Sequence, residues 1–252
     1  MDGAGVRSVL TALRVLERLA EPGVAAGVSE MARDLDLPKS SVQRMLRTLQ
    51  EGGWASEVRD QAVRWTLTPK MFQLGQRHHA GNDLRAIALP VMQQLWEETR
   101  ETVHLATVKG DSVFVLESLE SPQGVRAHVG LGMLLPILVS ANGRALISTW
   151  PDDQIHELIA RGLTAYNAHT ITDANALLAV IDQARKTGYA VNEQQWREGV
   201  HAVAAPIVVA GVGVAGIGIS TPVHRISAEL EEKYGALVVG AARAIAQGLG
   251  EG

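Results

Sequence analysis

The sequence predicts an α+β protein: an N-terminal winged helix-turn-helix domain and a C-terminal domain built on an antiparallel, GAF/PAS-like sheet. Apolar residues recur with a helical period at the start of the chain and with a period of two after about residue 100. Residues 1–78 hold 11 of the 23 Lys/Arg residues and 9 of the 27 Asp/Glu residues. Residues 79–252 therefore hold 12 basic and 18 acidic residues. Positive charge confined to one end of a chain is typical of a nucleic-acid-binding domain joined to a domain with another function. We expect a DNA-binding domain over 1–68, a linker helix over 69–83 and a second domain over 84–252.

Breaker and capping residues divide the first domain into short elements. Glu21-Pro22-Gly23 ends the first helix, Ser29 is a favourable N-cap for the second, and Pro38 suits the first turn of the third. Gly52-Gly53 supplies a left-handed C-terminal cap, after which two short strands form a wing. The expected elements are helices over 8–20, 29–37 and 38–51, and strands over 54–56 and 63–67.

The second domain alternates helices with antiparallel strands. The turn Lys109-Gly110-Asp111 and the pair Ala210-Gly211 each join two apolar strands, which indicates two hairpins. A third strand is expected at VRAHV (125–129), and another at GYAVN (188–192). Helices are expected over 69–79, 84–100, 141–150, 152–160, 173–187 and 224–248.

The third helix, within LPKSSVQRMLRTLQEGGW, has two distinct faces. Apolar residues at i, i+3, i+4 and i+7 form one stripe, which consists of Val42, Met45, Leu46 and Leu49. The opposite stripe carries no acid and consists of Ser40, Gln43, Arg44 and Arg47. A solvated helix face usually mixes both signs of charge, so this stripe favours an anionic partner. An ordinary basic surface helix is the alternative.

Several other classes of site are disfavoured. The chain has no cysteine, which excludes disulfides, thiolate nucleophiles and cysteine-ligated metal sites. Its eight histidines show no metal-binding spacing, and serine-nucleophile motifs are absent, so we predict no metal, no cofactor and no catalytic residues. GVGVAG (211–216) matches a dinucleotide fingerprint but leads into a strand, which favours a glycine-rich hairpin. With no signal peptide and no membrane-spanning run, we expect a cytoplasmic protein without membrane association.

Five blocks of the chain, in order, resemble the IclR family of bacterial transcription regulators. They are SVLTALRVLERLA with LPKSSVQRMLRTLQEGGW, ETVHLATVKGDSVFVLES, LPILVSANGRALIS, TGYAVNEQQWREGVHAVAAPI and GIGISTP. The resemblance implies a winged helix-turn-helix, a C-terminal effector-binding domain, and a homodimer or homotetramer acting on inverted-repeat operators in double-stranded DNA. It makes a ligand-responsive repressor of catabolic or metabolic genes the default expectation.

For the DNA-binding residues we name Lys39 at the start of the third helix, then Ser40, Ser41, Gln43, Arg44 and Arg47 along it. Arginine and lysine can reach guanine or phosphate, and glutamine can pair with adenine. Arg59 and Arg64 in the wing are assigned to phosphate, with a solvated turn charge as the alternative for Arg59.

The effector-binding positions come from the resemblance alone. They are Ala141, Asn142, Asn192, Val200, Ala202, Gly218 and Ser220. Ala202 and Gly218 lack the polar groups that family members offering sites for small oxo-acids commonly carry, and Leu134 and Leu138 replace a common arginine and histidine. We therefore expect more room and a larger or more apolar effector, such as an aromatic or aliphatic acid, held by Asn142, Asn192 and Ser220. Tight packing without a cavity is the alternative.

Two other functions stay open from the sequence. An enzyme for small molecules fused to a DNA-binding domain would turn over its ligand. A nonspecific DNA-binding protein would show little sequence preference, because its affinity comes almost entirely from phosphate contacts.

Overall fold

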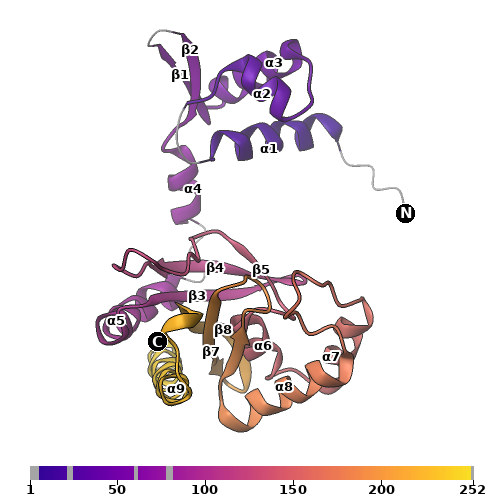
Figure 1. Cartoon of the computed structure of the whole chain (residues 1–252). Coiled ribbons are helices and arrows are strands. Elements are labelled where there is room, and N and C mark those ends of the chain that lie inside the picture. Colours follow the sequence, from indigo (N-terminus) through magenta and orange to yellow (C-terminus); the bar gives the residue numbers. More distant parts are fainter. Residues whose placement is uncertain (1–5, 22–24, 60–61, 78–81, 251–252) are drawn as a thin grey trace. The chain divides into compact units, whose positions relative to one another are not determined.

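The computed structural model describes residues 6–21, 25–59, 62–77 and 82–250, and for residues 59, 75–77, 82 and 83 it describes the backbone alone. The chain divides into two compact units, Met1–Ala80 and Gly81–Gly252 (Figure 1). None of the helices in the described ranges is long and apolar enough to span a bilayer.

The first unit is a helix-turn-helix followed by a two-stranded wing. Its elements are α1 (Arg7–Leu19), α2 (Val28–Asp34), α3 (Lys39–Glu51), β1 (Ala55–Arg59), β2 (Val63–Leu67) and α4 (Lys70–Arg77). Trp65 of β2 is fully buried beside Val15, Met31, Val42 and Leu46, so α1, α2, α3 and the wing contribute to one core. The wing also adds a bridge between Trp65 and Ala26, which ties the hairpin to the segment before α2.

The start of α2 differs from the prediction. Gly27, rather than Ser29, is the N-cap, and Glu30 reaches back to the Gly27 N–H as half of a capping box. Ser29 therefore lies inside the first turn of the helix. Gly53 has a φ of 73°, which confirms the left-handed turn expected after α3.

In the described part of the second unit, six strands form one antiparallel sheet in the order β5-β4-β3-β8-β7-β6. The hairpins β3–β4 and β7–β8 confirm the two predicted turns. The strands are β3 (Thr102–Lys109), β4 (Ser112–Leu119), β5 (Leu134–Pro136), β6 (Ala190–Glu193), β7 (Val200–Val209) and β8 (Val212–Pro222). The helices are α5 (Asn82–Thr99), α6 (Ala141–Ile147), α7 (Asp152–Ala160), α8 (Ala174–Thr187), the short 3-10 helix η1 (Val223–Arg225) and α9 (Ala228–Gly250).

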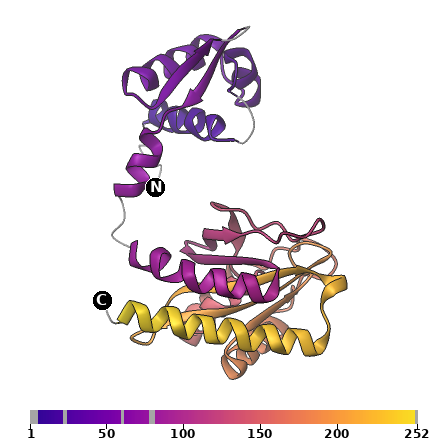
Figure 2. The same cartoon turned by 90° about the vertical axis from the view of Figure 1, so that its left-hand side faces the viewer.

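Both faces of the sheet are covered by helices. α5 and α9 lie side by side across one face (Figure 2), where they pack on Val103, Leu105, Ile217 and Ile219. α6, α7 and α8 lie on the other face. Because side chains alternate along a strand, His104, Ser220 and the Cβ positions of Gly216 and Gly218 share the face that α6 covers. The polar residues of the central strands are thereby brought to one buried place.

The strand expected at VRAHV (125–129) was wrong; β5 forms instead at residues 134–136. Side chains occupy the carbonyls that a neighbouring strand would need. Arg225, Thr102 and Ser118 donate hydrogen bonds to the carbonyl oxygens of residues 125, 127 and 129, respectively. The segment is therefore held in an irregular path over the end of the sheet.

Candidate functional sites

The predicted reader face of α3 is presented to solvent. Lys39, Ser40, Arg44 and Arg47 are exposed, and Ser41 and Gln43 are half-buried. Across the described ranges, none of these six side chains has a hydrogen-bond or ion-pair partner. The opposite stripe confirms its prediction, because Val42 and Leu46 are fully buried. α3 thus offers a row of free donors on a rigid, anchored helix.

The two ends of this face differ in charge. The first turn of α3 has no acidic residue, and the backbone N–H groups of Lys39 and Ser40 make no bond within the helix, an arrangement suited to a phosphate. At the other end, Glu51 is exposed one turn after Arg47, so the stripe ends in an acid that the sequence analysis left out of it.

Arg64 of the wing has partners inside the unit. Its Nη2 lies 3.0 Å from Glu30 Oε2, and its Nε donates to the Ala25 carbonyl. Glu30 also receives a hydrogen bond from Arg18 of α1, at 3.2 Å. Arg64 therefore joins the wing to α1 and α2, and its assignment to phosphate stays a prediction. The side chain of Arg59 lies outside the described part of the chain.

A small cavity in the second unit collects most of the predicted effector-binding residues. About 20 Å³ is left among its walls, which is room for one water molecule. The predicted residues that line it are Ala141, Asn142, Asn192, Val200, Ala202 and Ser220, and the others are His104, His128, Val129, Leu135, Ser140, Trp196 and Arg197. That second group, which includes two histidines and an arginine, was not predicted from the sequence.

Gly218 does not line the cavity, because its place is beneath His104. A Cβ at residue 218 would lie 2.7 Å from His104 Cε1 and 3.1 Å from Ala204 Cβ. The space that the sequence analysis expected for a larger effector is therefore filled by the imidazole, and the expectation of more room was wrong for this structure. Leu134 is half-exposed outside the cavity and Leu138 does not line it either.

His104 is the centre of a buried polar chain. Its Nε2 lies 2.8 Å from Ser220 Oγ and its Nδ1 lies 2.6 Å from Asn142 Nδ2. Burial lowers the pKa of His104 to about 4, so the imidazole is neutral at neutral pH. The sequence does contain a signal for this buried histidine. His104 is a polar residue within the apolar strand TVHLA, and the strand that pairs with it contains the glycine-rich run GVGVAGIG.

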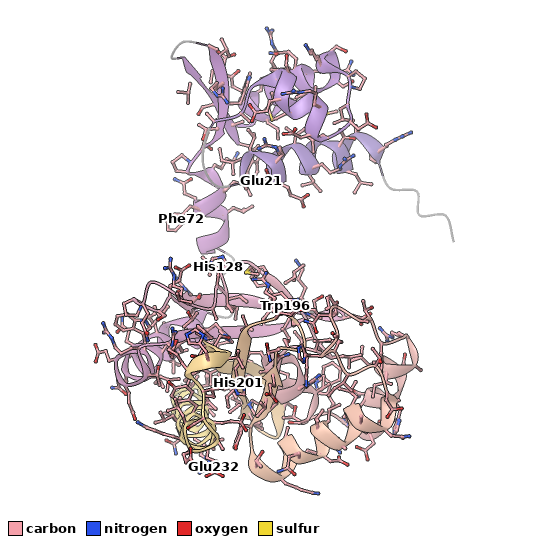
Figure 3. The ribbon with its side chains drawn as sticks, viewed as in Figure 1. Glu21, Phe72, His128, Trp196, His201 and Glu232 are labelled. Carbon is pink, nitrogen blue, oxygen red and sulfur yellow. The ribbon has the colours of Figure 1, made fainter. Side chains whose placement is uncertain are left out.

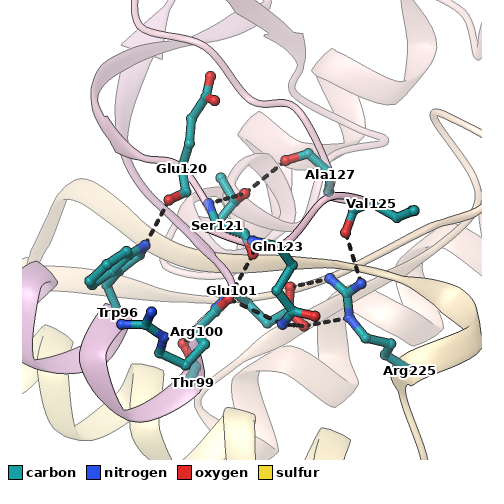
Figure 4. A network of polar contacts seen from close by, with 11 residues as sticks. Trp96, Thr99, Arg100, Glu101, Glu120, Ser121, Gln123, Val125, Ala127 and Arg225 are labelled. Atoms are coloured by element: carbon teal, nitrogen blue, oxygen red, sulfur yellow. Dashed lines mark hydrogen bonds and ion pairs between the residues drawn. The ribbon is translucent and has the colours of Figure 1, made fainter.

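The outer wall of the cavity is the irregular segment 120–130. A polar network anchors its far end, where Arg225 holds the buried Glu101 carboxylate through contacts of 2.8 and 2.7 Å (Figure 4). At the cavity end, Arg197 Nη1 donates to the His128 carbonyl at 3.2 Å. His128 and Trp196 lie on the same side of the second unit (Figure 3). Single side-chain contacts, rather than a strand ladder, hold this wall.

Arg144 of α6 holds together the segments on either side of the cavity. It is 1% exposed, and it donates to the carbonyls of Leu138 and Val191 and to the side chain of Gln195. Burial lowers the pKa of Arg144 to about 10, and none of the residues that the structure describes supplies it with a carboxylate partner. This cation joins the segment before α6 to the segment after β6, on either side of the cavity.

The residues that the structure describes form neither a metal-binding cluster nor a nucleotide-binding loop. Within the described ranges, no group of three His, Cys, Asp or Glu side chains is placed to hold a metal ion. GVGVAG forms the β7–β8 turn and the start of β8, with Gly211 at a φ of 81°. The glycine-rich hairpin that the sequence analysis favoured is therefore confirmed.

Comparisons with known proteins cover nearly the whole chain. The model of the IclR helix-turn-helix domain matches residues 8–59, and that of the bacterial transcriptional regulator IclR C-terminal domain matches residues 77–247. The HTH-type transcriptional regulator KdgR of Escherichia coli K12 is 32% identical over 248 residues, covering 97% of this chain and 93% of KdgR. The HTH-type transcriptional repressor AllR of the same strain is 29% identical over 248 residues, covering 98% of this chain and 91% of AllR.

A solved structure shares the fold of both units. The IclR homologue of Microbacterium hydrocarbonoxydans, solved in complex with 4-hydroxybenzoate, has a TM-score of 0.84 and 24% identity, with 97% of this chain and 100% of that chain covered. The relatives are named as transcription regulators, which are not enzymes, so the fused-enzyme alternative is set aside. The chain belongs to the IclR family of bacterial transcriptional regulators, and it is a ligand-responsive, DNA-binding regulator of transcription.

Proposed function

We propose that this protein is a repressor that binds an inverted-repeat operator as a homodimer or homotetramer and responds to an apolar or aromatic acid in its second unit. The observation that carries the DNA-binding part is the row of six partnerless donors on α3. A helix that is anchored in the core by one face and carries free arginine, lysine and amide groups on the other suits the major groove. We propose repression rather than activation because the relative AllR is named a repressor.

An apolar groove on the first unit supports assembly of two copies. It has a volume of about 590 Å³ and lies between α1, α3 and α4. Val9, Leu13 and Leu74 line it and are 55%, 49% and 52% exposed, and Phe72, 69% exposed, projects from α4 nearby (Figure 3). Exposed apolar surface of this kind marks an interface. A second copy can cover the apolar part of this groove through a two-fold contact and thereby present two α3 helices to two half-sites. Arg44 also lines the groove, so it lies beside that contact as well as on the outer face of α3.

The cavity of the second unit supports a small acid as the effector. Its walls combine apolar residues such as Val129, Leu135 and Trp196 with the donors Ser220 and Arg197. At about 20 Å³ the cavity has to expand before an aromatic ring can enter. The segment 120–130 is the wall suited to move, because side chains rather than a neighbouring strand hold the carbonyls of residues 125, 127 and 128. The complex of the Microbacterium homologue with 4-hydroxybenzoate agrees with this class of ligand.

Effector binding alters repression only if the ligand prefers one of two arrangements of the paired first units. Movement of the segment 120–130 supplies a conformational difference on which such a preference can act. Since the target is chromosomal DNA, we expect the protein to act in the cytoplasm.

The DNA-binding proposal is tested with two arginine variants at fixed salt. Arg44→Ala removes a member of the α3 row, and we expect specific binding to weaken by roughly 1–3 kcal/mol, the scale of one base contact. Arg33→Ala removes the same charge from the exposed end of α2 and is the matched control. The ratio of specific to nonspecific affinity should fall in the Arg44 variant alone. An equal, small loss in both variants would instead support a nonspecific electrostatic binder.

The effector proposal is tested by thermal denaturation with a panel of acids. Benzoate and 4-hydroxybenzoate should raise the melting temperature more than pyruvate or glyoxylate at equal concentration. Greater stabilisation by pyruvate would refute the proposed ligand class while leaving the DNA-binding proposal intact.

A further inference from the structure

One wall of the effector cavity is a chain of hydrogen bonds through Asn142, His104 and Ser220. The three side chains belong to α6, β3 and β8, and they are 1%, 2% and 2% exposed. Nδ2 of Asn142 lies 2.6 Å from Nδ1 of His104, and Nε2 of His104 lies 2.8 Å from Oγ of Ser220. A neutral imidazole has one N–H and one lone pair, so the direction of one hydrogen bond fixes the direction of the other.

Gly216 fixes the direction at the far end of the chain. A Cβ built on Gly216 would lie 2.7 Å from Asn142 Oδ1, so the Cα–H bond in that position points at the amide oxygen. Asn142 Oδ1 is buried and has no hydrogen-bond partner among the described residues, so the C–H group of Gly216 is its one favourable, weak contact. In the flipped amide both N–H donors would face this C–H group and stay unsatisfied, which is the less favourable arrangement. Asn142 therefore keeps its oxygen toward Gly216 and its Nδ2 toward His104.

The remaining directions follow from the chemistry of each group. Nδ1 of His104 accepts from Asn142, so the single imidazole proton is on Nε2, which donates to Ser220 Oγ. The Ser220 hydroxyl has no acceptor among the residues that the structure describes. Its proton is free to point into the cavity, which Ser220 lines.

We infer that Asn142 and His104 are positioning residues that make Ser220 a hydrogen-bond donor to the effector, so that the site selects a ligand presenting an unprotonated oxygen, a carboxylate above all, at Ser220. Arg197, which also lines the cavity, adds positive charge that favours an anion. The inference rests on the proposed effector site. It specifies that Ser220 recognises the carboxylate of the ligand and that Asn142 and His104 orient the Ser220 hydroxyl.

The direction of the chain can be measured without any ligand. Histidine-selective ¹⁵N labelling of the full chain reports which imidazole nitrogen carries the proton, and His104→Gln identifies the signal. At pH 7 we expect His104 to be neutral with the proton on Nε2. A proton on Nδ1, or a doubly protonated ring, would overturn the inference even if every acid in the panel bound.

A pair of matched substitutions tests the role of Asn142. In Asn142→Asp, the residue facing Nδ1 becomes an acceptor, and we expect the proton of His104 to move to Nδ1. Asn192→Asp introduces the same group into the same cavity, at a residue that is 4% exposed and donates to the Val139 carbonyl instead. That variant should keep the proton on Nε2. The same tautomer in both variants would contradict the role of Asn142, and circular dichroism establishes that each has folded.

Ligand selectivity completes the test with benzoate and benzamide as probes. We expect the wild-type protein to bind benzoate at least about tenfold more tightly than benzamide, and Ser220→Ala to remove about tenfold of the benzoate affinity. Equal affinity for the two probes would overturn the inference about the ligand group. If neither probe binds, the proposed aromatic class is wrong, and the tautomer still decides whether the chain has the inferred direction.

Discussion

The ion pair between Arg225 and Glu101 should be one of the strongest single stabilising contacts of the second unit. Both carboxylate oxygens of Glu101 are engaged, at 2.8 and 2.7 Å, and Glu101 is 2% exposed (Figure 4). Arg225→Ala would leave this carboxylate buried without its cation. Breaking a buried pair in this way costs about 3–5 kcal/mol. Because the Arg225 side chain is 22% exposed and water can replace part of it, we expect the lower end, about 3 kcal/mol.

A second ion pair, within the segment 120–130, provides the control. Arg126 and Glu120 lie 3.1 Å apart, but their side chains are 42% and 43% exposed. Surface pairs of this kind contribute about 0–1 kcal/mol, so Arg126→Ala should have a small effect. The two variants remove the same charge and leave carboxylates of very different exposure.

Urea denaturation of the full chain, followed by circular dichroism at one protein concentration, measures the difference. We expect the free energy of unfolding to fall by about 3 kcal/mol in Arg225→Ala and by less than about 1 kcal/mol in Arg126→Ala. For a domain of this size, 3 kcal/mol corresponds to a fall in melting temperature of roughly 6–12 °C. Equal losses in the two variants would refute the argument that burial makes the Glu101 pair strong.

Three further outcomes are expected. Gly216→Ala places a Cβ 2.7 Å from Asn142 Oδ1, so the melting curve should show a loss of about 1–3 kcal/mol; an unchanged melting temperature would contradict the close packing of that glycine. His104 has a folded pKa of about 4 against 6.5 unfolded, so its contribution is complete above pH 6.5 and is lost as the pH falls toward 4, a change of about 3 kcal/mol. Urea titrations at several pH values should show a shallower dependence in His104→Gln but not in His156→Gln, where the side chain is exposed. Arg144→Met leaves three acceptors without their donor, so the free energy of unfolding should fall by about 3–5 kcal/mol, and a neutral result would remove the buried cation as a support of the cavity walls.

The architecture followed from local signals in the sequence. Helical periodicity located α1 and α3, the Gly110-Asp111 and Ala210-Gly211 turns located two hairpins, and the buried stripe of α3 was predicted residue by residue. These features depend on neighbours within about ten residues, which is the range over which periodicity and turn chemistry act.

The details that failed depend on contacts between distant segments. VRAHV has the composition of a strand, but Arg225, a hundred residues away, takes the Val125 carbonyl. Likewise, the missing side chain of Gly218 led us to predict space for a ligand. In the structure the imidazole of His104, from the neighbouring strand, fills that space. The polar centre of the cavity was missed for the same reason, since pairing of β3 with β8 is what brings His104 to Ser220.

In vitro selection from fragmented host DNA at fixed salt shows whether this protein is a sequence-specific regulator that reads paired half-sites through α3. We expect recovery of a few sites that contain an inverted repeat, with half-sites about one helical turn apart or a multiple of it. Those sites should be lost when Arg44→Ala replaces the wild-type protein. Diffuse recovery that fades as salt is raised, equally for both proteins, would contradict the claim and indicate phosphate binding alone.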